Sequence, residues 1–254
     1  MAQPPVLEPA RQLPDWVTLV RADNPGPMTL DGTNSWILVT PGGRRVVVDP
    51  GPADEAHLAA LAAQTPSLIL VTHHHPDHVD GLPRLCELLG NPAVEVWDRV
   101  EEHRSLSGMD ISLLATPGHT ADSVCFRVEV AGQRVVLTGD TMLGRGTTIV
   151  DGDLGDYLHS LRRLAGLGPV PVLPGHGPAL GDCAAAAQAY LEHREARLHQ
   201  VREALAAGAR TPREIVERVY AEVDRAVWPA AEATVAAQLA YLESSGRSVR
   251  WDTP

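Results

Sequence analysis

The sequence contains no lysine, so all 21 of its basic residues are arginine, against 32 aspartates and glutamates. The resulting formal net charge of −11 excludes the cationic surface of a general nucleic-acid-binding protein. Aromatic residues are scarce as well, at 4%, with a single phenylalanine. We attribute both shortages to compositional bias. The hydrophobic content of 44% is still enough for a full core in a globular protein.

Cysteines and long apolar segments are also few. The three cysteines, Cys86, Cys125 and Cys183, are widely spaced and odd in number, which predicts neither a disulfide framework nor a cysteine-based metal site. No segment approaches the roughly 18 apolar residues of a membrane span. The first residues lack the basic and then apolar pattern of a secretory signal. We therefore expect a cytoplasmic protein that does not contact membranes.

Turn-forming residues divide the first part of the chain into short strands and helices. We predict helices at 53–64, from the histidine-rich segment to about residue 89, and at 154–167. Strands are predicted at 16–20, 35–40, 45–48, 68–71, 94–97, 111–115, 124–130, 134–137 and 170–173. A meander of strands that later mixes with helices predicts an α/β sandwich, with two sheets inside and helices outside.

The composition changes after Cys183, and we expect two domains, at 1–183 and 184–254. The second begins with a helix at 184–207, and Thr211 and Glu214 form a capping box that starts another helix. A third helix at 229–243 and a short strand at 249–251 make this part resemble a winged-helix module. The third helix contains no arginine, so we do not expect it to bind duplex DNA. We expect the module to cap the active-site cleft or to form the subunit interface of a homodimer.

The segment from Leu68 to Gly81, LILVTHHHPDHVDG, ends a predicted buried strand with four closely spaced polar side chains: His73, His75, Asp77 and His78. Imidazole and carboxylate groups are the ligands that suit zinc and similar divalent ions. A tight loop can direct alternate residues at one metal ion and the next pair at another. The segment therefore predicts a metal site at the end of the strand.

Three later strands end in comparable polar residues. His119, Asp140 and His176 each follow an apolar strand and lie beside glycine, in TPGHT, TGDT and PGHG. Loops that meet at one edge of a sandwich bring such side chains together. We expect five other histidines to be surface or core residues rather than ligands: His57, His103, His159, His193 and His199. A resemblance described in the next paragraph implies the same for His74.

The pattern H-x-H-x-D-H, followed by separate His, Asp and His residues, resembles the metallo-beta-lactamase (MBL) fold superfamily. The similarity runs from about Asp23 to Gly177 and implies a four-layer αβ/βα sandwich. It implies that His73, His75 and His119 bind one metal ion, that Asp77, His78 and His176 bind the other, and that Asp140 bridges them. Asp49, in VVVDPG, would orient a ligand from outside the metal shell. The implied cofactor is a pair of zinc ions, although manganese or iron would also fit.

A finer resemblance, to the beta-lactamase-like protein 2 group, rests on residues 24–38, 139–161 and the helical C-terminal module. That group includes a single-strand endoribonuclease and metal-dependent thioesterases. The implied chemistry is hydrolysis by a hydroxide shared between two metal ions, with Asp77 orienting it. We favour an ester or thioester with an acyl group as substrate, because the chain is acidic. The alternative substrate is single-stranded RNA. Less favoured functions are those of a beta-lactamase and of a non-catalytic scaffold.

Two further residues are candidates for contact with the substrate. Arg145, in LGRGTT, follows Asp140 by five residues and could meet an anionic group. Asn34, after Gly32 and Thr33, could donate to the substrate or hold a loop. A surface arginine and a turn asparagine are equally compatible with the sequence.

Overall fold

The computed structural model describes residues 5–90, 95–96 and 102–244 and contains two five-stranded sheets. The first sheet has the order β1-β2-β3-β4-β5. Its first three strands are antiparallel, whereas β3, β4 and β5 run parallel. Its strands are β1 (Val17–Arg21), β2 (Asn34–Val39), β3 (Arg45–Val48), β4 (Leu68–Leu70) and β5 (Glu95–Val96).

The second sheet has the order β10-β9-β8-β7-β6. Strands β6 to β9 form an antiparallel meander, and β10 joins β9 in parallel. Its strands are β6 (His103–Leu106), β7 (Met109–Ala115), β8 (Val124–Val130), β9 (Gln133–Gly139) and β10 (Val172–Pro174). Because β4, β9 and β10 each lead into a polar loop, their ends determine where the candidate ligands lie.

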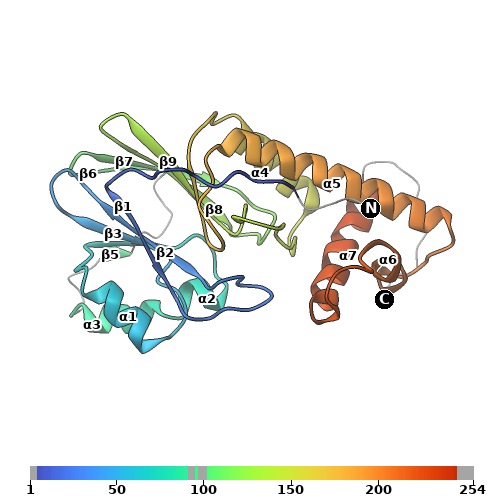
Figure 1. The fold of residues 1–254 in the computed structure, drawn as a ribbon, viewed down its shortest axis with the longest axis horizontal. Coiled ribbons are helices and arrows are strands. Elements are labelled where there is room, and N and C mark those ends of the chain that lie inside the picture. Colours follow the sequence, from blue (N-terminus) through green and yellow to red (C-terminus); the bar gives the residue numbers. More distant parts are fainter. Residues whose placement is uncertain (1–4, 91–94, 97–101, 245–254) are drawn as a thin grey trace.

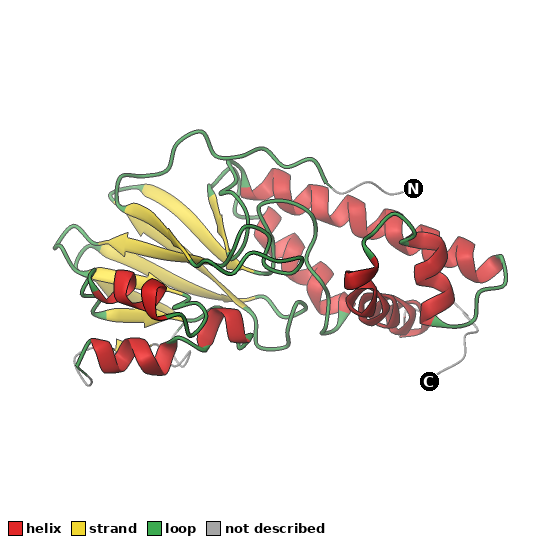
Figure 2. Cartoon of the chain, turned by 60° about the horizontal axis from the view of Figure 1, so that its bottom comes forward, coloured by secondary structure: helices red, strands yellow, loops and turns green. Residues whose placement is uncertain are grey.

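Helices cover the outer face of each sheet and complete four layers (Figures 1 and 2). Helices α1 (Glu55–Ala62) and α3 (Leu82–Leu88) lie on the first sheet, where Leu58, Leu61 and Leu85 pack against Ile37 and Ile69. Helices α4 (Leu154–Ala165) and α5 (Cys183–Ala206) cover the second. The four-layer sandwich predicted from the sequence is confirmed.

The core between the two sheets is made of alternate residues of facing strands. Leu38, Val46 and Leu70 from the first sheet share one buried cluster with Ile111 and Leu137 from the second. This alternation follows from the strand period of two, which sends successive side chains to opposite faces. The apolar core thus holds the two sheets together beneath the loops at their edge.

The C-terminal module is built on α5, which extends from the sandwich to α6 (Pro212–Val219) and α7 (Trp228–Ser244) (Figure 1). Thr211 and Glu214 form the predicted capping box at the start of α6. A 3₁₀ helix, η1 (Arg225–Val227), precedes α7. Buried residues of all three α-helices belong to the same apolar cluster as α4, so the module packs continuously onto the second sheet's outer layer.

The structure differs from the sequence prediction in a few segments. Strand β6 was not predicted, because HRSL is polar, yet it pairs with β7 across a turn at Ser107 and Gly108 with positive φ angles. The helix expected after the histidine-rich loop is divided into α2 (Pro76–Val79) and α3. The strand predicted at 249–251 lies outside the described residues. No described helix has the length and apolar character that crossing a membrane requires.

Candidate metal centre

All seven predicted ligands lie on loops or short helices that follow strands at one edge of the sandwich. His73 and His75 follow β4, and Asp77 and His78 lie on α2 directly after them. The other three come from different segments: His119 from the β7–β8 loop, Asp140 from the end of β9, and His176 from the loop after β10. The tertiary structure therefore brings together residues separated by about a hundred positions.

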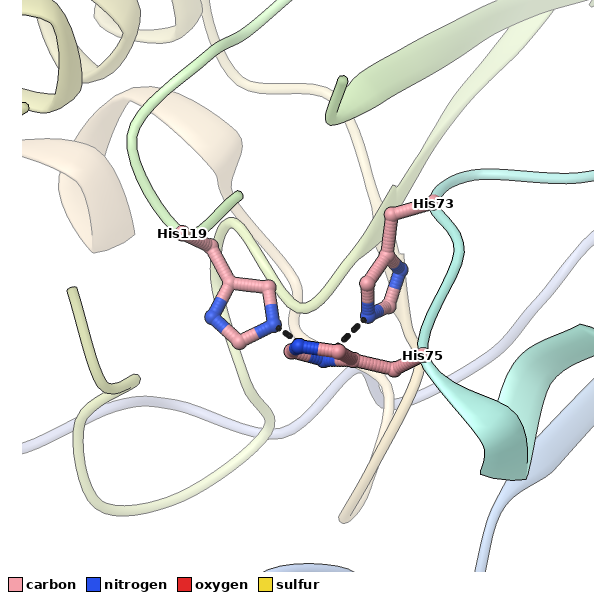
Figure 3. Close-up of side chains that lie close together, drawn as sticks. All are labelled: His73, His75 and His119. Carbon is pink, nitrogen blue, oxygen red and sulfur yellow. Dashed lines mark hydrogen bonds between the residues drawn. The ribbon is translucent and has the colours of Figure 1, made fainter. Parts of the chain in front are cut away.

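Three histidines form the first group, His73, His75 and His119 (Figure 3). Nδ1 of His75 lies 3.0 Å from Nε2 of His73 and 3.0 Å from Nε2 of His119. The rings are edge-on to one another, with interplanar angles of 76° and 84°. Three ring nitrogens therefore converge from two loops on one small volume.

Asp77, His78 and His176 form the second group. Nε2 of His176 lies 3.1 Å from Oδ2 of Asp77 and 3.3 Å from Nε2 of His78. Asp140 reaches both groups, because its Oδ2 is 3.3 Å from Nε2 of His176 and 3.8 Å from Nε2 of His119. The carboxylate of Asp140 therefore lies between the two groups.

In three of the rings, the nitrogen that points away from the centre meets a carbonyl or carboxylate oxygen, which fixes the ring's orientation. Nδ1 of His119 is 2.8 Å from the carbonyl oxygen of Ile149, and Nδ1 of His78 is 2.9 Å from Oδ2 of Asp49. Nδ1 of His176 faces the carbonyl oxygen of Gly32 at 3.3 Å. Carbonyl and carboxylate oxygens only accept, so each of these Nδ1 atoms carries a proton, and the neutral form of each ring offers the lone pair of Nε2 to the centre.

Asp49 forms hydrogen bonds with residues of the candidate metal centre through both of its carboxylate oxygens. The backbone N–H of Thr72 donates to Oδ1 at 2.7 Å, and the Thr72 hydroxyl donates to Oδ2 at 2.8 Å. Because that hydroxyl has used its proton, it accepts from Nδ1 of His73 at 3.0 Å. Asp49 thus contacts His78 directly and His73 through Thr72.

Two glycines are required where the strand-end loops crowd the centre. A Cβ atom on Gly175 would lie 2.5 Å from Oδ1 of Asp140 and 2.6 Å from Cε1 of His78. Gly139 has a φ of +47°, and a Cβ there would lie 2.4 Å from Oγ1 of Thr72. Neither position has room for a side chain, so the glycines of TGDT and PGHG serve packing around the ligands.

Burial and neighbouring charges shift the pKa values of the ligands in opposite directions. Burial, reinforced by the charge of His78, lowers the pKa of His73 to about 2. For His176, burial favours the neutral form, but the carboxylates of Asp140 and Asp77 outweigh it and raise the pKa to about 9. For Asp77, burial is outweighed by the hydrogen bond from His176, and the pKa falls to about 2. The carboxylates are therefore ionised and favour cations around them.

The donor set fits divalent metal ions. Ring nitrogens of five histidines face one another at 3.0 to 3.3 Å, an arrangement that protons alone cannot satisfy at every nitrogen. Oδ1 of Asp140 is buried, has no hydrogen-bond partner among the described residues, and lies 3.4 Å from Nε2 of His78. A buried oxygen of this kind is costly unless a cation or donor meets it. Imidazole and carboxylate groups in these numbers suit zinc, and also manganese or iron.

The two candidate substrate-binding residues occupy different environments. Asn34 is fully buried, and its amide nitrogen donates to the carbonyl oxygens of Pro174 at 3.0 Å and Gly177 at 2.8 Å. The Asn34 amide therefore joins the start of β2 to the loop after β10, and its contact with substrate stays a prediction. Arg145 lines a cavity beside Asp140, and its guanidinium pairs with Asp31 at 2.5 and 2.8 Å.

The histidines that were not expected to be ligands lie outside both groups. His74 is exposed, and its Nδ1 lies 2.7 Å from Oδ1 of Asp122. His57 is buried against the hydroxyl of Ser35 at 2.9 Å. His103, His159, His193 and His199 also lie outside both ligand groups.

A pocket of about 270 Å³ opens over the ligands. His75, Asp77 and His176 form part of its floor, while Ala230 and Ala233 of α7 form part of its wall. The C-terminal module thus contributes one side of the pocket above the candidate metal centre.

Comparisons with known proteins agree with this architecture. The sequence model of the metallo-beta-lactamase superfamily matches residues 28–106 and 95–176. The chain belongs to the metallo-beta-lactamase superfamily. The superfamily's associated winged helix domain matches residues 211–253, which confirms the module predicted at the C-terminus of this metallo-beta-lactamase superfamily member.

Its relatives place this superfamily member in the beta-lactamase-like protein 2 group. It is 33% identical over 245 residues to the Beta-lactamase-like protein 2 homolog of Caenorhabditis elegans, covering 87% of this chain and 82% of the relative. It is also 33% identical over 250 residues to the Atrochrysone carboxyl ACP thioesterase of Aspergillus fumigatus, covering 83% and 78%.

A solved beta-lactamase domain protein from Burkholderia ambifaria has the same fold as this superfamily member. The TM-score is 0.79 at 23% identity, and the match covers 94% of this chain and 92% of that one.

Several residues that hold the metal-centre ligands were not identified from the sequence. Thr72 lies next to the predicted ligands, and its place at the end of β4 could have suggested a role. Ile149 and Gly32 act through backbone carbonyl oxygens, for which a side-chain pattern carries no information. Their contribution follows from where the loops pass in three dimensions.

Proposed function

We propose that the protein is a hydrolase that uses two zinc ions to cleave an ester or thioester of an acyl substrate. One observation carries the proposal: seven nitrogen and carboxylate ligands converge in two groups, with Asp140 between them and one of its oxygens without a hydrogen-bond partner. His73, His75 and His119 would hold one ion, and Asp77, His78 and His176 the other. Such ions supply Lewis acidity and lower the pKa of water.

The residues around the centre suit hydrolysis. Asp77 lines the pocket, and its ionised carboxylate can accept a hydrogen bond from an attacking water and orient it. Asp49 and Thr72 keep His73 and His78 in place while charge changes beside them. No described serine or cysteine nucleophile is needed in this scheme.

The acyl substrate is supported by charge and by a relative. The net charge of −11 disfavours a polyanion, and α7, which lines the pocket, contains no arginine. The A. fumigatus relative is named a thioesterase. Both support an acyl thioester over single-stranded RNA.

The test compares the metal-loaded protein on acyl thioesters and on single-stranded RNA, each with and without a chelator. We expect thioester hydrolysis that the chelator abolishes, and metal analysis that finds two zinc ions per chain. Cleavage of RNA without thioester hydrolysis would replace the acyl proposal by the nuclease alternative.

Substitution of the ligands tests the metal centre itself. In Asp140→Ala and His75→Ala, turnover should be lost and metal content should fall. His74→Ala is the matched control, because this neighbouring imidazole points to Asp122. Full activity in either ligand variant would contradict the proposal.

A further inference from the structure

A second cavity continues from the pocket over the candidate metal centre. It has a volume of about 230 Å³ and lies between the 146–149 loop, α5 and α7. Met28, Ile149 and Ala230 line both spaces. The two are therefore adjoining parts of one cleft, and a molecule held at the metal centre can extend into the second part.

Two arginines of α5 line this second cavity although they are buried. Arg194 is only 2% exposed and Arg197 only 5%. Most of the lining surface is apolar, and includes Val223, Val227 and Ala231. A guanidinium remains charged in proteins, and its charge is strongly disfavoured in such surroundings unless an anion or a set of acceptors meets it.

The described residues do not provide that anion for Arg194. Its guanidinium donates to the carbonyl oxygen of Thr148 and lies 5.3 Å from the centre of the Tyr157 ring, but it forms no ion pair with a described carboxylate. Its Nε has no hydrogen-bond partner. Tyr157 cannot serve as counter-charge, because burial raises the pKa of its hydroxyl to about 12.

Arg197 has more partners, yet it does not remove the excess of positive charge. It donates to the carbonyl oxygen of Val219 at 2.7 Å and lies 3.4 Å from Oε1 of the half-exposed Glu222. Its Nε also lacks a partner. Among the described residues, Arg197 therefore has one carboxylate in ion-pair contact and Arg194 has none.

We propose that Arg194, assisted by Arg197, binds an anionic group at the far end of whichever arm of the thioester substrate, acyl or thiol, extends into the cavity next to the metal centre. This inference rests on the proposed function and specifies its substrate class. The apolar walls accommodate the arm, and the guanidinium without a carboxylate partner binds a carboxylate or a phosphate. The scissile carbonyl then lies at the metal centre.

The lining of the cavity favours a single anionic end rather than RNA. A nucleic-acid strand carries one charge per nucleotide and is bound by a succession of cations along a groove. Here two arginines lie on adjacent turns of one helix, within mainly apolar walls. The anion could belong to a carboxylated acyl group or to the phosphate of a phosphopantetheine carrier, and the assay distinguishes the two.

The experiment compares substrates that differ only in the terminal charge. Zinc-loaded protein is assayed with the pentanoyl and glutaryl thioesters of N-acetylcysteamine, and with pentanoyl thioesters of pantetheine and 4′-phosphopantetheine. We expect the wild type to prefer the charged member of one pair. In Arg194→Gln, the ratio of kcat/KM between charged and neutral members should fall about 10- to 100-fold, as for loss of a charged hydrogen bond. A smaller fall is expected for Arg197→Gln.

Arg202→Gln is the matched control, since Arg202 lies on α5 and does not line the cavity. It removes the same charge and should leave the ratio unchanged. If Arg194→Gln lowers kcat/KM equally for charged and neutral members, Arg194 only holds the Thr148 loop and the inference is wrong. Loss of RNA cleavage with no change in thioester selectivity would likewise overturn it.

A binding measurement separates this inference from the proposed function. Glutarate and inorganic phosphate are titrated by calorimetry into chelator-treated wild type and Arg194→Gln. Binding of either anion to the wild type, and its loss in the variant, supports the anion site even if no thioester is hydrolysed. Thioester hydrolysis without charge preference, together with no anion binding, would leave the proposed function intact and overturn the inference.

Discussion

The edge of the two sheets and the C-terminal module form opposite walls of the same cleft, but they are constructed differently. At the sheet edge, seven polar side chains crowd together on short loops, and nearly every ring nitrogen that points away from the centre meets an oxygen. In the module, α5, α6 and α7 pack apolar side chains continuously with α4.

This difference separates the roles of the two walls. Changes at the sheet edge should alter metal binding and chemistry, because the side chains there bind or orient ligands. Changes in the module's core should alter stability, because its helices are held mainly by apolar burial. The buried arginines of α5 are the exception, and they face the cleft.

The largest effect is expected in the module's core. Leu239→Ala removes a fully buried side chain of α7, which should lower the free energy of unfolding by about 2–5 kcal/mol. Urea unfolding measures the loss, and the exposed substitution Ala240→Ser on the same helix is the control. Equal stability of Leu239→Ala and the control would show that α7 is not packed as described.

The next effect is at the sheet edge. Asp49→Asn keeps the size of the side chain but removes the charge that faces Thr72 and His78. We expect metal affinity or kcat/KM to fall about 10- to 100-fold, as when a residue that orients a metal ligand is changed. Competition with a chromophoric chelator measures the affinity. The control is Asp110→Asn, at an exposed position on β7, which should have the metal affinity of the wild type. If Asp49→Asn also has that affinity, Asp49 does not act through the metal ligands.

The pH dependence of the chelator-treated protein should reveal the charges at the sheet edge. Asp140 and Asp77 outweigh burial and raise the pKa of His176 to about 9, so folding favours its protonated form. The stability that this contributes is fully present below the unfolded pKa of about 6.5 and is lost as pH rises through about 9. Urea midpoints between pH 6 and 9.5 measure the decline.

Metal uptake should displace the same proton. Calorimetry near pH 7.5 in buffers of different ionisation enthalpy should show proton release on zinc binding, because a ligand must be deprotonated.

In His176→Gln, the decline of stability with pH should become smaller. If stability declines with pH as steeply in this variant as in the wild type, groups other than His176 cause the decline.

The smallest effect is expected for Arg145→Gln. This exposed arginine pairs with Asp31, and exposed ion pairs contribute about 1 kcal/mol or less. We expect a rise in KM of less than about fivefold with little change in kcat. Arg134→Gln, exposed on β9, is the control. A rise of a hundredfold would instead make Arg145 a principal contact with substrate.

The seven residues that the structure brings together could be singled out because they carry the chemistry in their side chains. His73, His75, Asp77 and His78 are close in the sequence, and His119, Asp140 and His176 each follow an apolar strand beside glycine. The strand pattern also predicted both sheets, except for β6, whose HRSL sequence is too polar to be identified by alternation. How the seven residues bind metal stays a prediction for the experiments above.

The sequence by itself determined the chemical character of this protein, because ligand type and strand period are properties of individual residues and their spacing. Only the tertiary structure decided which atoms hold those ligands and which residues reach the cleft. The carbonyl oxygens of Gly32 and Ile149 and the buried guanidinium of Arg194 depend on how distant loops and helices pass one another. Such contacts join segments far apart in the chain, and no local pattern encodes them.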